Sequence, residues 1–224
     1  MTNSHKMKKI SRKERERLAR KEAIIDAAEE VITLKGFKNS TMDEIAEKAE
    51  LGKGTLYLYF NSKTSIYLAI CDRGSKLLNQ KMAQVITMDI KGIEMVKEMG
   101  HVYLDFIKSN PIYFNAFNFF ENSLSEDRLV ESAIVDDLQE HGVEAMTYVV
   151  RALQIGMQDG TIRTNYDPKE LGIIFWGASR GVIQVAYMKE NRKSLKILSD
   201  INFSLESLVN SFIDIIGSGI KNDQ

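Results

Sequence analysis

The sequence predicts an all-α protein made of an N-terminal three-helix helix-turn-helix head and a C-terminal helical bundle. Only two prolines, Pro111 and Pro168, interrupt its 224 residues. Apolar residues recur at helical spacing, and no stretch of any length alternates between apolar and polar residues as a half-buried strand does. Hydrophobic residues make up 44% of the chain and charged residues 27%, which is the composition of an ordinary globular protein.

The N-terminal part begins with a basic arm and a long helix. Residues 1–12 show no apolar periodicity, so they are expected to form an arm. A helix is expected from about Lys13 to Lys35, because apolar residues recur every three or four positions along it. Gly36 follows directly and suits a left-handed C-cap.

Two short helices are expected next, over residues 42–50 and 55–60. Thr41 and Glu44 form a capping-box pattern that starts the first of them. The second is too short to be stable alone and must be held by packing. Two residues in the turn between them would allow a sharp change of direction: Gly52 and Gly54. A rigid pair that carries lysines and tyrosines favours the groove and phosphates of DNA as its partner.

Six further helices are expected in the rest of the chain: Ser62–Val85, Gly92–Lys108, Ile112–Asn122, Glu126–Gln158, Pro168–Glu190 and Ser204–Gly217. The first of these would run from the head into the body and link the two. No apolar run reaches the length of a membrane span, and the basic N-terminus lacks the apolar core of a secretory signal. The lone Cys71 excludes an internal disulfide and suits a reducing cytoplasm.

Charge is divided unevenly along the chain. Residues 1–63 hold 14 Lys and Arg against 10 Asp and Glu, a net charge of +4. Residues 64–224 hold 16 against 21, a net charge of −5. A basic head on an acidic body is typical of a DNA-binding protein with a separate second domain. A solvated tail would explain the charge alone equally well, but the helix pair that follows favours DNA.

The segment from Thr41 to Lys63, TMDEIAEKAELGKGTLYLYFNSK, resembles the DNA-binding head of the tetracycline-repressor (TetR) family of transcriptional regulators. The resemblance extends upstream to AAEEVITLKGF at residues 27–37 and covers roughly residues 20–70. It implies a DNA-binding domain over residues 1–62 and an effector-binding and dimerisation domain over residues 63–224. Two departures predict looser local geometry: Gly52 replaces a frequent capping serine, and Ser65 replaces a frequent acidic capping residue.

The resemblance implies DNA contacts from the helix pair and its flanks: Thr41, Lys53, Gly54, Thr55, Tyr57, Leu58, Tyr59 and Lys63. Lys63, at a helix N-terminus, would offer a charge and backbone N–H groups to a phosphate. Lys53 could read guanine or pair with a phosphate. Leu56 and Phe60 are expected in the core. Tyr57 has the alternative interpretation of a half-buried packing side chain.

Two further sets of residues are expected to serve the body. Aromatic side chains could line an apolar effector pocket, although a solid aromatic core is the alternative: Tyr103, Phe106, Tyr113, Phe117, Phe120 and Trp176. The family's dimers pack two C-terminal helices against their symmetry mates, which implies interface positions in this chain: Gly177, Gly181, Val185, Leu208 and Phe212.

Residues 177–181, Gly-Ala-Ser-Arg-Gly, match the G-x-S-x-G nucleophile elbow letter for letter. That motif follows a strand and precedes a triad histidine, whereas these flanks predict a helix and every histidine lies upstream. Two glycines four residues apart are better explained as a close approach between helices. His101 and His141 each share a helical face with acidic residues, but solvated pairs explain them better than a metal. No metal or cofactor is predicted.

Together these features predict a cytoplasmic, ligand-responsive repressor that is not an enzyme. It would bind a palindromic operator as a homodimer, with recognition helices about 34–36 Å apart, and a small apolar effector would release it. It would not interact with membranes. The alternatives are an activator, an effector-independent DNA-binding protein, or a helical enzyme, for which the sequence shows no catalytic constellation.

Overall fold

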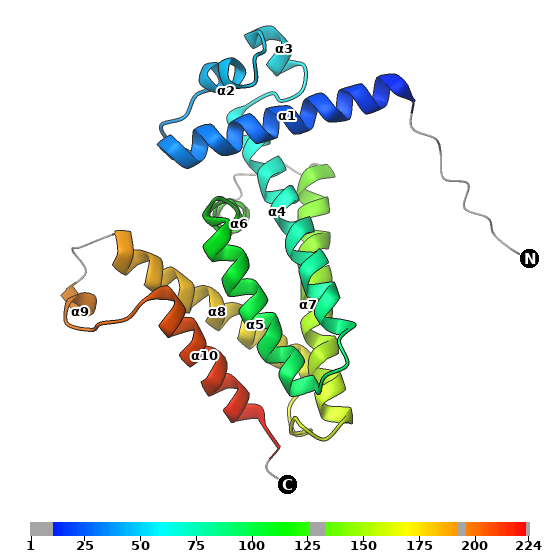
Figure 1. Cartoon of the computed structure of the whole chain (residues 1–224), viewed down its shortest axis with the longest axis vertical. Helices are drawn as coiled ribbons and strands as arrows, with labels where there is room; N and C mark the ends of the chain where they lie inside the picture. The colour runs from blue at the N-terminus through cyan, green and yellow to red at the C-terminus, as the bar shows by residue number, and fades with distance from the viewer. Residues whose placement is uncertain (1–10, 126–132, 192–195, 223–224) are drawn as a thin grey trace, which may run out of the picture. The chain divides into compact units, whose positions relative to one another are not determined.

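The computed structural model describes residues 11–125, 133–191 and 196–222, and within them it is all-α, as predicted (Figure 1). The described helices are α1 (Arg12–Lys35), α2 (Met42–Lys48), α3 (Lys53–Tyr57), α4 (Lys63–Ile86), α5 (Gly92–Ser109), α6 (Pro111–Ser125), α7 (Ala133–Gln158), α8 (Pro168–Asn191), α9 (Lys196–Ser199) and α10 (Leu205–Ile220). The short α9 was not expected. The start predicted at Glu126 for the α7 helix, and nearly all of the basic arm, lie outside the described residues.

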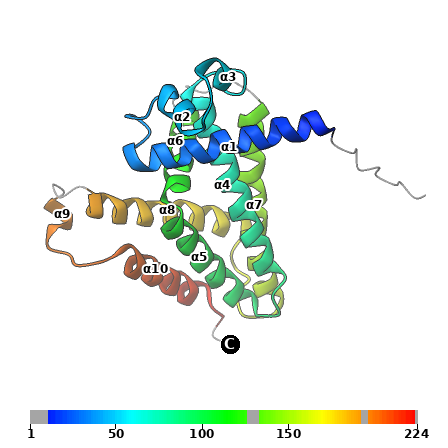
Figure 2. The ribbon, with the colours of Figure 1, turned by 45° about the horizontal axis from the view of Figure 1, so that its top comes forward.

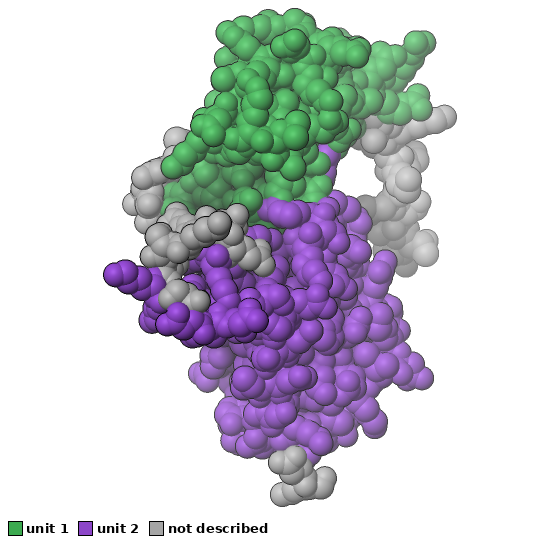
Figure 3. Space-filling model, turned by 60° about the vertical axis from the view of Figure 1, so that its left-hand side comes forward, with its two compact units in different colours: residues 1–71, 112–130 green, residues 72–111, 131–224 purple. Residues whose placement is uncertain are grey.

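The chain divides into two compact units (Figure 3). The first unit comprises residues 1–71 and 112–130, and the second comprises residues 72–111 and 131–224. The helix α4 therefore belongs to both units, and α6 belongs to the first unit although it follows α5 in the chain. The domain boundary expected after residue 62 stays a prediction, because the first unit draws on more of the chain than that head.

The first unit is built around the apolar side of α1. Ile24, Ala28 and Ile32 follow one another at four-residue spacing and are all buried. The five residues of α3 cannot form a stable helix by themselves. Two side chains hold that helix, since Leu56 is fully buried and Phe60 nearly so. Both residues lie in the core, as predicted.

Local caps fix the helix ends of the first unit. Thr41 Oγ1 accepts from Glu44 N, and the Glu44 carboxylate accepts from Thr41 N, so the predicted capping box is present. A hydrogen bond from Lys35 is the largest cause that lowers the pKa of Glu44, followed by those from Thr41. Ser62 and Ser65 cap each other at the start of α4. The loosening expected from Ser65 is therefore absent.

The turn between α2 and α3 differs from the expectation based on its glycines. Gly52 has a φ of −65° and is the N-cap of α3, without a side-chain hydrogen bond. Gly54 has no close neighbour that would exclude a side chain. The residue with a left-handed backbone is instead Glu50, with a φ of 54°. Gly36 ends α1 with a positive φ of 79°, but its ψ of 157° lies outside the left-handed helical region that was predicted for this cap.

In the second unit, long-range contacts fix the start of α5, whereas a local capping box of Ser204 and Ser207 starts α10. A Cβ on Gly92 would collide with the backbone of Gly156, so α5 and α7 touch at two glycines. Asp159 accepts from Gly92 N at 2.7 Å, and Thr161 Oγ1 accepts from Ile93 N at 3.2 Å. Partial burial would raise the pKa of Asp159, but hydrogen bonds from Thr161 and Gly92 outweigh it and lower that pKa. The connector between α7 and α8 therefore caps α5.

The helix α8 corrects the expectation that no segment could span a membrane. Residues 168–189 are long and apolar enough to do so by length and composition, and only 22% of that window is buried. The helix α8 therefore carries an apolar surface that the other described residues leave uncovered.

Candidate nucleic-acid interface and associated sites

The eight residues predicted to contact DNA all lie in the first unit, on the α2–α3 pair and its flanks, with Thr41 before α2, Leu58 and Tyr59 after α3, and Lys63 at the start of α4. Tyr57 and Leu58 are 42% and 78% exposed. Lys53 and Gly54 are also exposed, whereas Thr55 and Tyr59 are half-buried. Because Leu56 is fixed in the core, its neighbours along α3 must point outward. The packing role considered for Tyr57 is therefore the weaker interpretation.

Lys53 forms an ion pair with α2. Its Nζ lies 2.7 Å from Asp43 Oδ1, and this hydrogen-bonded carboxylate raises the pKa of Lys53. Both side chains are well exposed, and exposed ion pairs contribute little to stability. The ammonium can therefore exchange Asp43 for a phosphate or a base edge at little cost to the fold.

Lys63 is placed differently from the sequence expectation. Its Nζ donates to the carbonyl oxygens of Ser40, at 2.6 Å, and of Phe37. It also lies 4.6 Å from the centre of the Phe37 ring, a cation–π contact. In this structure the ammonium holds the α1–α2 loop against the start of α4 instead of facing outward. It positions the helix pair.

An aromatic cluster, which the sequence did not indicate, joins α6 to the same loop. The rings of Phe37 and Tyr67 are stacked with centroids 4.4 Å apart, and Phe119 of α6 lies 5.0 Å and 5.1 Å from them. Burial raises the pKa of Tyr67 far above its usual range. The contact with Phe119 explains why α6 belongs to the first unit.

The six aromatic residues predicted to line an effector pocket are divided between the units. Tyr113, Phe117 and Phe120 lie on α6 in the first unit, and the other three lie in the second. Trp176 is 50% exposed and stacks near Arg180, so it is not part of a core in this chain. The two clearest hollows among the described residues are lined by none of these six side chains.

The predicted dimer positions lie on open surfaces of α8 and α10. A Cβ added to Gly177 or Gly181 would meet no atom within 4 Å. Val185 is 38% exposed, and Leu208 and Phe212 are half-buried. Around them lie further exposed apolar residues: Ile173, Ile174, Trp176 and Ile215. The two glycines thus make no close contact with another described helix, which leaves them available to a second chain.

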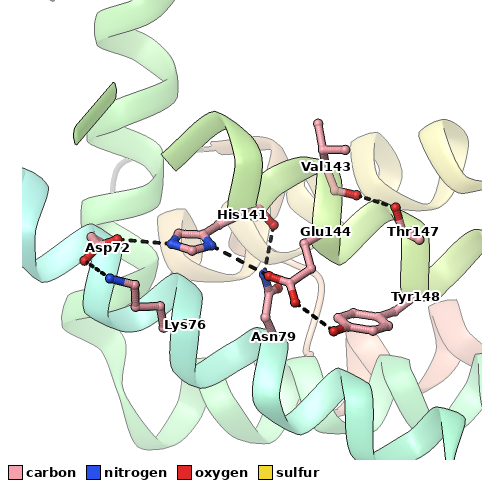
Figure 4. Close-up of polar contacts among 8 residues, drawn as sticks. All are labelled: Asp72, Lys76, Asn79, His141, Val143, Glu144, Thr147 and Tyr148. Atoms are coloured by element: carbon pink, nitrogen blue, oxygen red, sulfur yellow. Dashed lines mark hydrogen bonds and ion pairs between the residues drawn. The ribbon is translucent and has the colours of Figure 1, made fainter. Parts of the chain in front are cut away.

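A polar network fastens α4 to α7 in the second unit (Figure 4). The buried Asn79 donates to His141 O at 3.0 Å and to Glu144 Oε2 at 2.8 Å. His141 Nε2 lies 3.2 Å from Asp72 Oδ1. Tyr148 donates to Glu144 Oε1 at 2.7 Å; this bond and the one from Asn79 lower the pKa of Glu144. The acidic neighbours of His141 are thus Asp72 and Glu144.

The other chemical candidates of the sequence do not form a site. In the part of the chain that the structure describes, no three His, Cys, Asp or Glu side chains gather closely enough to hold a metal. The G-x-S-x-G stretch lies inside α8, where Ser179 Oγ donates to Trp176 O at 3.0 Å. A nucleophile elbow needs a strand-to-helix turn, so this resemblance carries no catalytic meaning.

With this geometry established, comparison with known proteins decides the family. The sequence profile described as "Bacterial regulatory proteins, tetR family" matches residues 24–70, which contain α2, α3 and the core that holds them. The chain belongs to the TetR family. It is accordingly a DNA-binding transcriptional regulator, with the recognition element predicted from the sequence.

Similarity to known regulators also extends beyond the head. The chain is 26% identical over 202 residues to the fatty acid metabolism regulator protein of Bacillus subtilis, covering 89% of this chain and 94% of that protein. The structure of FadR from Bacillus subtilis in complex with stearoyl-CoA is similar at 22% identity, with a TM-score of 0.64 over 89% and 98% of the two chains.

A second solved structure, AibR in complex with isovaleryl coenzyme A and operator DNA, is similar at 17% identity. Its TM-score is 0.61 over 88% of this chain and 97% of that one. At these identities the two solved structures establish the fold of the whole chain and nothing further.

Proposed function

We propose that the protein is a repressor that binds a near-palindromic operator as a homodimer and releases it when an acyl-chain effector enters the second unit. The observation that carries this proposal is the exposed face of α3. Lys53, Tyr57 and Leu58 lie together on a helix that is fixed from behind by Leu56. A cation, a hydroxyl-bearing ring and an aliphatic side chain can bind phosphate, base edges and thymine methyl groups respectively.

The homodimer is supported by the apolar surface of α8 and α10. These helices pack together, yet each leaves large aliphatic or aromatic side chains exposed. Gly177 and Gly181 would allow a second copy of α8 to approach closely. A two-fold dimer also matches two operator half-sites, about 34–36 Å apart. The surface that makes α8 resemble a membrane span is thus the surface that a partner subunit would cover.

An apolar effector is supported by the interior of the second unit. Asn79 is the only buried polar side chain among the described residues of that unit. Three methionines are buried there: Met82, Met95 and Met99. Unbranched, flexible methionines repack readily, so the unit can open around a flexible apolar chain. The similarity to a fatty acid metabolism regulator over most of both chains suggests an acyl chain as that ligand.

Release of DNA would be transmitted through α4. In the second unit Asn79 and Asp72 fasten this helix to α7, and in the first unit Lys63 ties its start to the α1–α2 loop. Displacement of α7 by an effector would therefore shift α4 and, through Lys63, the α2–α3 pair. Since the effector and the operator would favour different conformers, each must weaken the binding of the other.

The proposal assigns no catalysis to the chain. The relative that it matches over most of its length is a metabolic regulator, and the serine of the G-x-S-x-G stretch lies inside a helix. We place the protein in the bacterial cytoplasm, where its DNA target lies.

Selection from a random duplex library tests the DNA-binding part. The wild-type protein should enrich a two-fold symmetric sequence with half-sites one helical turn apart. The Tyr57→Ala/Leu58→Ala variant, matched in fold by its melting temperature, should enrich none. A wild-type protein that enriches no sequence would contradict sequence-specific binding, and a transcription assay on the enriched site would then distinguish repression from activation.

Thermal unfolding with acyl-CoA probes tests the effector part. Stearoyl-CoA should raise the melting temperature, because a ligand that binds only the folded state stabilises it. Coenzyme A without an acyl chain is the control and should have little effect. The shift with isovaleryl-CoA, which has a shorter acyl chain, shows how much the length of that chain contributes to the change in melting temperature. Equal shifts with stearoyl-CoA and free coenzyme A would contradict an acyl-chain site.

A further inference from the structure

The N-terminal half of α1 extends beyond the core of the first unit. Residues 11–20 are all exposed, and the first buried residue of the helix is Ile24 (Figures 1 and 2). Because this segment buries no side chain, packing adds little to its stability. The cap at its N-terminus is therefore the main contact that stabilises it as a helix. Ser11 Oγ provides this cap by accepting from Glu14 N at 3.2 Å.

This extension is strongly basic. Residues 12–21 contain six Lys and Arg against two Asp and Glu. Arg12 and Glu16 neutralise each other in an ion pair of 2.8 Å. The described structure gives no ion-pair partner for Lys13, Arg15, Arg17 or Arg20. Four positive charges are therefore exposed and without an ion pair among the described residues of this helix.

Three of these four charges, those of Lys13, Arg17 and Arg20, lie on one side of the helix. Residues seven apart lie on nearly the same face of an α-helix, with a drift of about 20°. Arg17 continues the row of the buried Ile24 and Val31, and Arg20 continues the row of the buried Ala27. Arg17 and Arg20 thus lie on the same side of α1 that is buried further along the helix, from Ile24 onward. Arg15 lies in another row, with the exposed Glu22.

The base of the extension lies beside the recognition element. Lys21 Nζ is 5.7 Å from the centre of the Phe60 ring, just after α3. From Lys21 back to Arg12 the helix spans about 14 Å at 1.5 Å per residue. Phosphates follow one another every 3.4 Å along a DNA strand, so this length corresponds to roughly four base pairs beyond Phe60.

We propose that the N-terminal extension of α1 is a second DNA-contacting element, which binds phosphates that flank the operator core through Arg17 and Arg20. The proposal rests on the proposed operator binding and adds a separate surface to it. Duplex DNA is the partner because the extension is a row of unpaired cations on the same compact unit as α3, and phosphate contacts carry no demand for a particular base.

Two duplexes and three variants test the proposal. The probes are the enriched operator core alone and the same core with twelve base pairs added at each end. The variants are Arg17→Gln, Arg20→Gln and, as the control of equal charge, Arg15→Gln. Binding is measured by fluorescence anisotropy over a series of salt concentrations. All three positions are exposed, and melting temperatures verify that the fold is unchanged.

Arg17→Gln and Arg20→Gln should each weaken binding to the flanked duplex several-fold. Each variant dimer would neutralise two phosphates fewer, so the slope of log affinity against log salt should fall by about 1.8 units. Binding to the core alone, and binding of Arg15→Gln to either duplex, should not change. Equal losses from Arg15→Gln and Arg17→Gln would show a net-charge effect only, and no loss from any variant would show a solvated extension; both overturn the proposal. Binding of the wild-type protein to the core duplex tests the proposed operator binding separately from the role of the extension.

Discussion

The two compact units expose different surfaces, although both cap helices locally. Side chains three residues apart cap a helix start in each unit, Thr41 with Glu44 in the first and Ser204 with Ser207 in the second. The second unit adds a long-range cap, since Asp159 accepts from the backbone of a helix that begins 67 residues earlier. The first unit exposes aromatic and aliphatic side chains among lysines, whereas α8 exposes large apolar side chains beside glycines.

This difference shows that an exposed apolar side chain has no single meaning. Leu58 is 78% exposed between residues that can bind phosphate and bases, a setting that fits a polyanion. Ile173 and Trp176 are exposed beside glycines on α8, a setting that fits another helix. Charge and side-chain size around the apolar group therefore indicate which partner it meets.

The largest expected effect is that of Gly181→Leu on assembly. A leucine would overpack the proposed α8 contact between subunits and cost the dimer about 1–3 kcal/mol or more. Sedimentation at micromolar concentration should show a dimer for the wild type and a shift toward monomer for the variant. Binding to the two-half-site operator should weaken accordingly.

The matched control for Gly181→Leu is Gly142→Leu. Gly142 is also an exposed helical glycine of the second unit with no atom within 4 Å of an added Cβ. It lies on α7, outside the proposed interface, so this variant should remain a dimer. A monomeric wild type, or equal dissociation of both variants, would refute the assignment of the α8 surface.

The next largest effect distinguishes the two lysines of the first unit. Lys63→Met removes the donor for the carbonyl oxygens of Phe37 and Ser40, and leaving such groups unsatisfied costs about 1–3 kcal/mol of unfolding free energy. Lys53→Met removes only an exposed ion pair and should change that free energy by less than about 1 kcal/mol.

For operator binding the order should be reversed, with a larger effect of Lys53→Met than of Lys63→Met. Lys53→Met should reduce the salt dependence of binding, by about one unit of slope for each phosphate that the protein no longer neutralises. Lys63→Met should leave that slope nearly unchanged in the folded protein. A reduced slope with an unchanged melting temperature for Lys63→Met would restore the phosphate contact that the sequence suggested for this residue.

The sequence predicted local features better than long-range contacts for a physical reason. The capping box, the C-cap glycine and the buried Leu56 depend on residues within a few positions, so their patterns are visible in the sequence. The contacts of Lys63 with residues 37–40, of Asp159 with Gly92 and of Phe119 with Phe37 join distant segments. No local pattern indicates them, and the placement of α6 in the first unit depends on one of them.

A smaller effect is expected for Leu58→Ala on sequence discrimination. If Leu58 contacts a thymine methyl group, its truncation should cost about 1 kcal/mol of operator binding, roughly a fivefold change in affinity, from the apolar area it no longer buries. Binding to random DNA should be unaffected, since that binding depends on phosphates. Competition between operator and random duplexes measures both, and a uniform loss on both duplexes would contradict base contact by Leu58.

The smallest expected effect concerns the pH dependence of the second unit. Because the folded-state pKa of Asp159 is lowered, its stabilisation is present above the unfolded pKa of about 3.9 and is lost as pH falls through the folded value. Asp159→Asn should destabilise the protein by up to about 1 kcal/mol at pH 5. The difference from the wild type in thermal unfolding should shrink toward pH 3, and a difference that is constant with pH would contradict the role of this carboxylate.

The most direct test of the account measures how the effector and the operator influence each other. The dissociation constant of the dimer for its enriched operator is determined with and without saturating stearoyl-CoA, and that for stearoyl-CoA with and without saturating operator. The account predicts that each ligand weakens the other by the same factor, in the range of about 5–150-fold. Operator affinity that is unchanged while stearoyl-CoA is bound would contradict it.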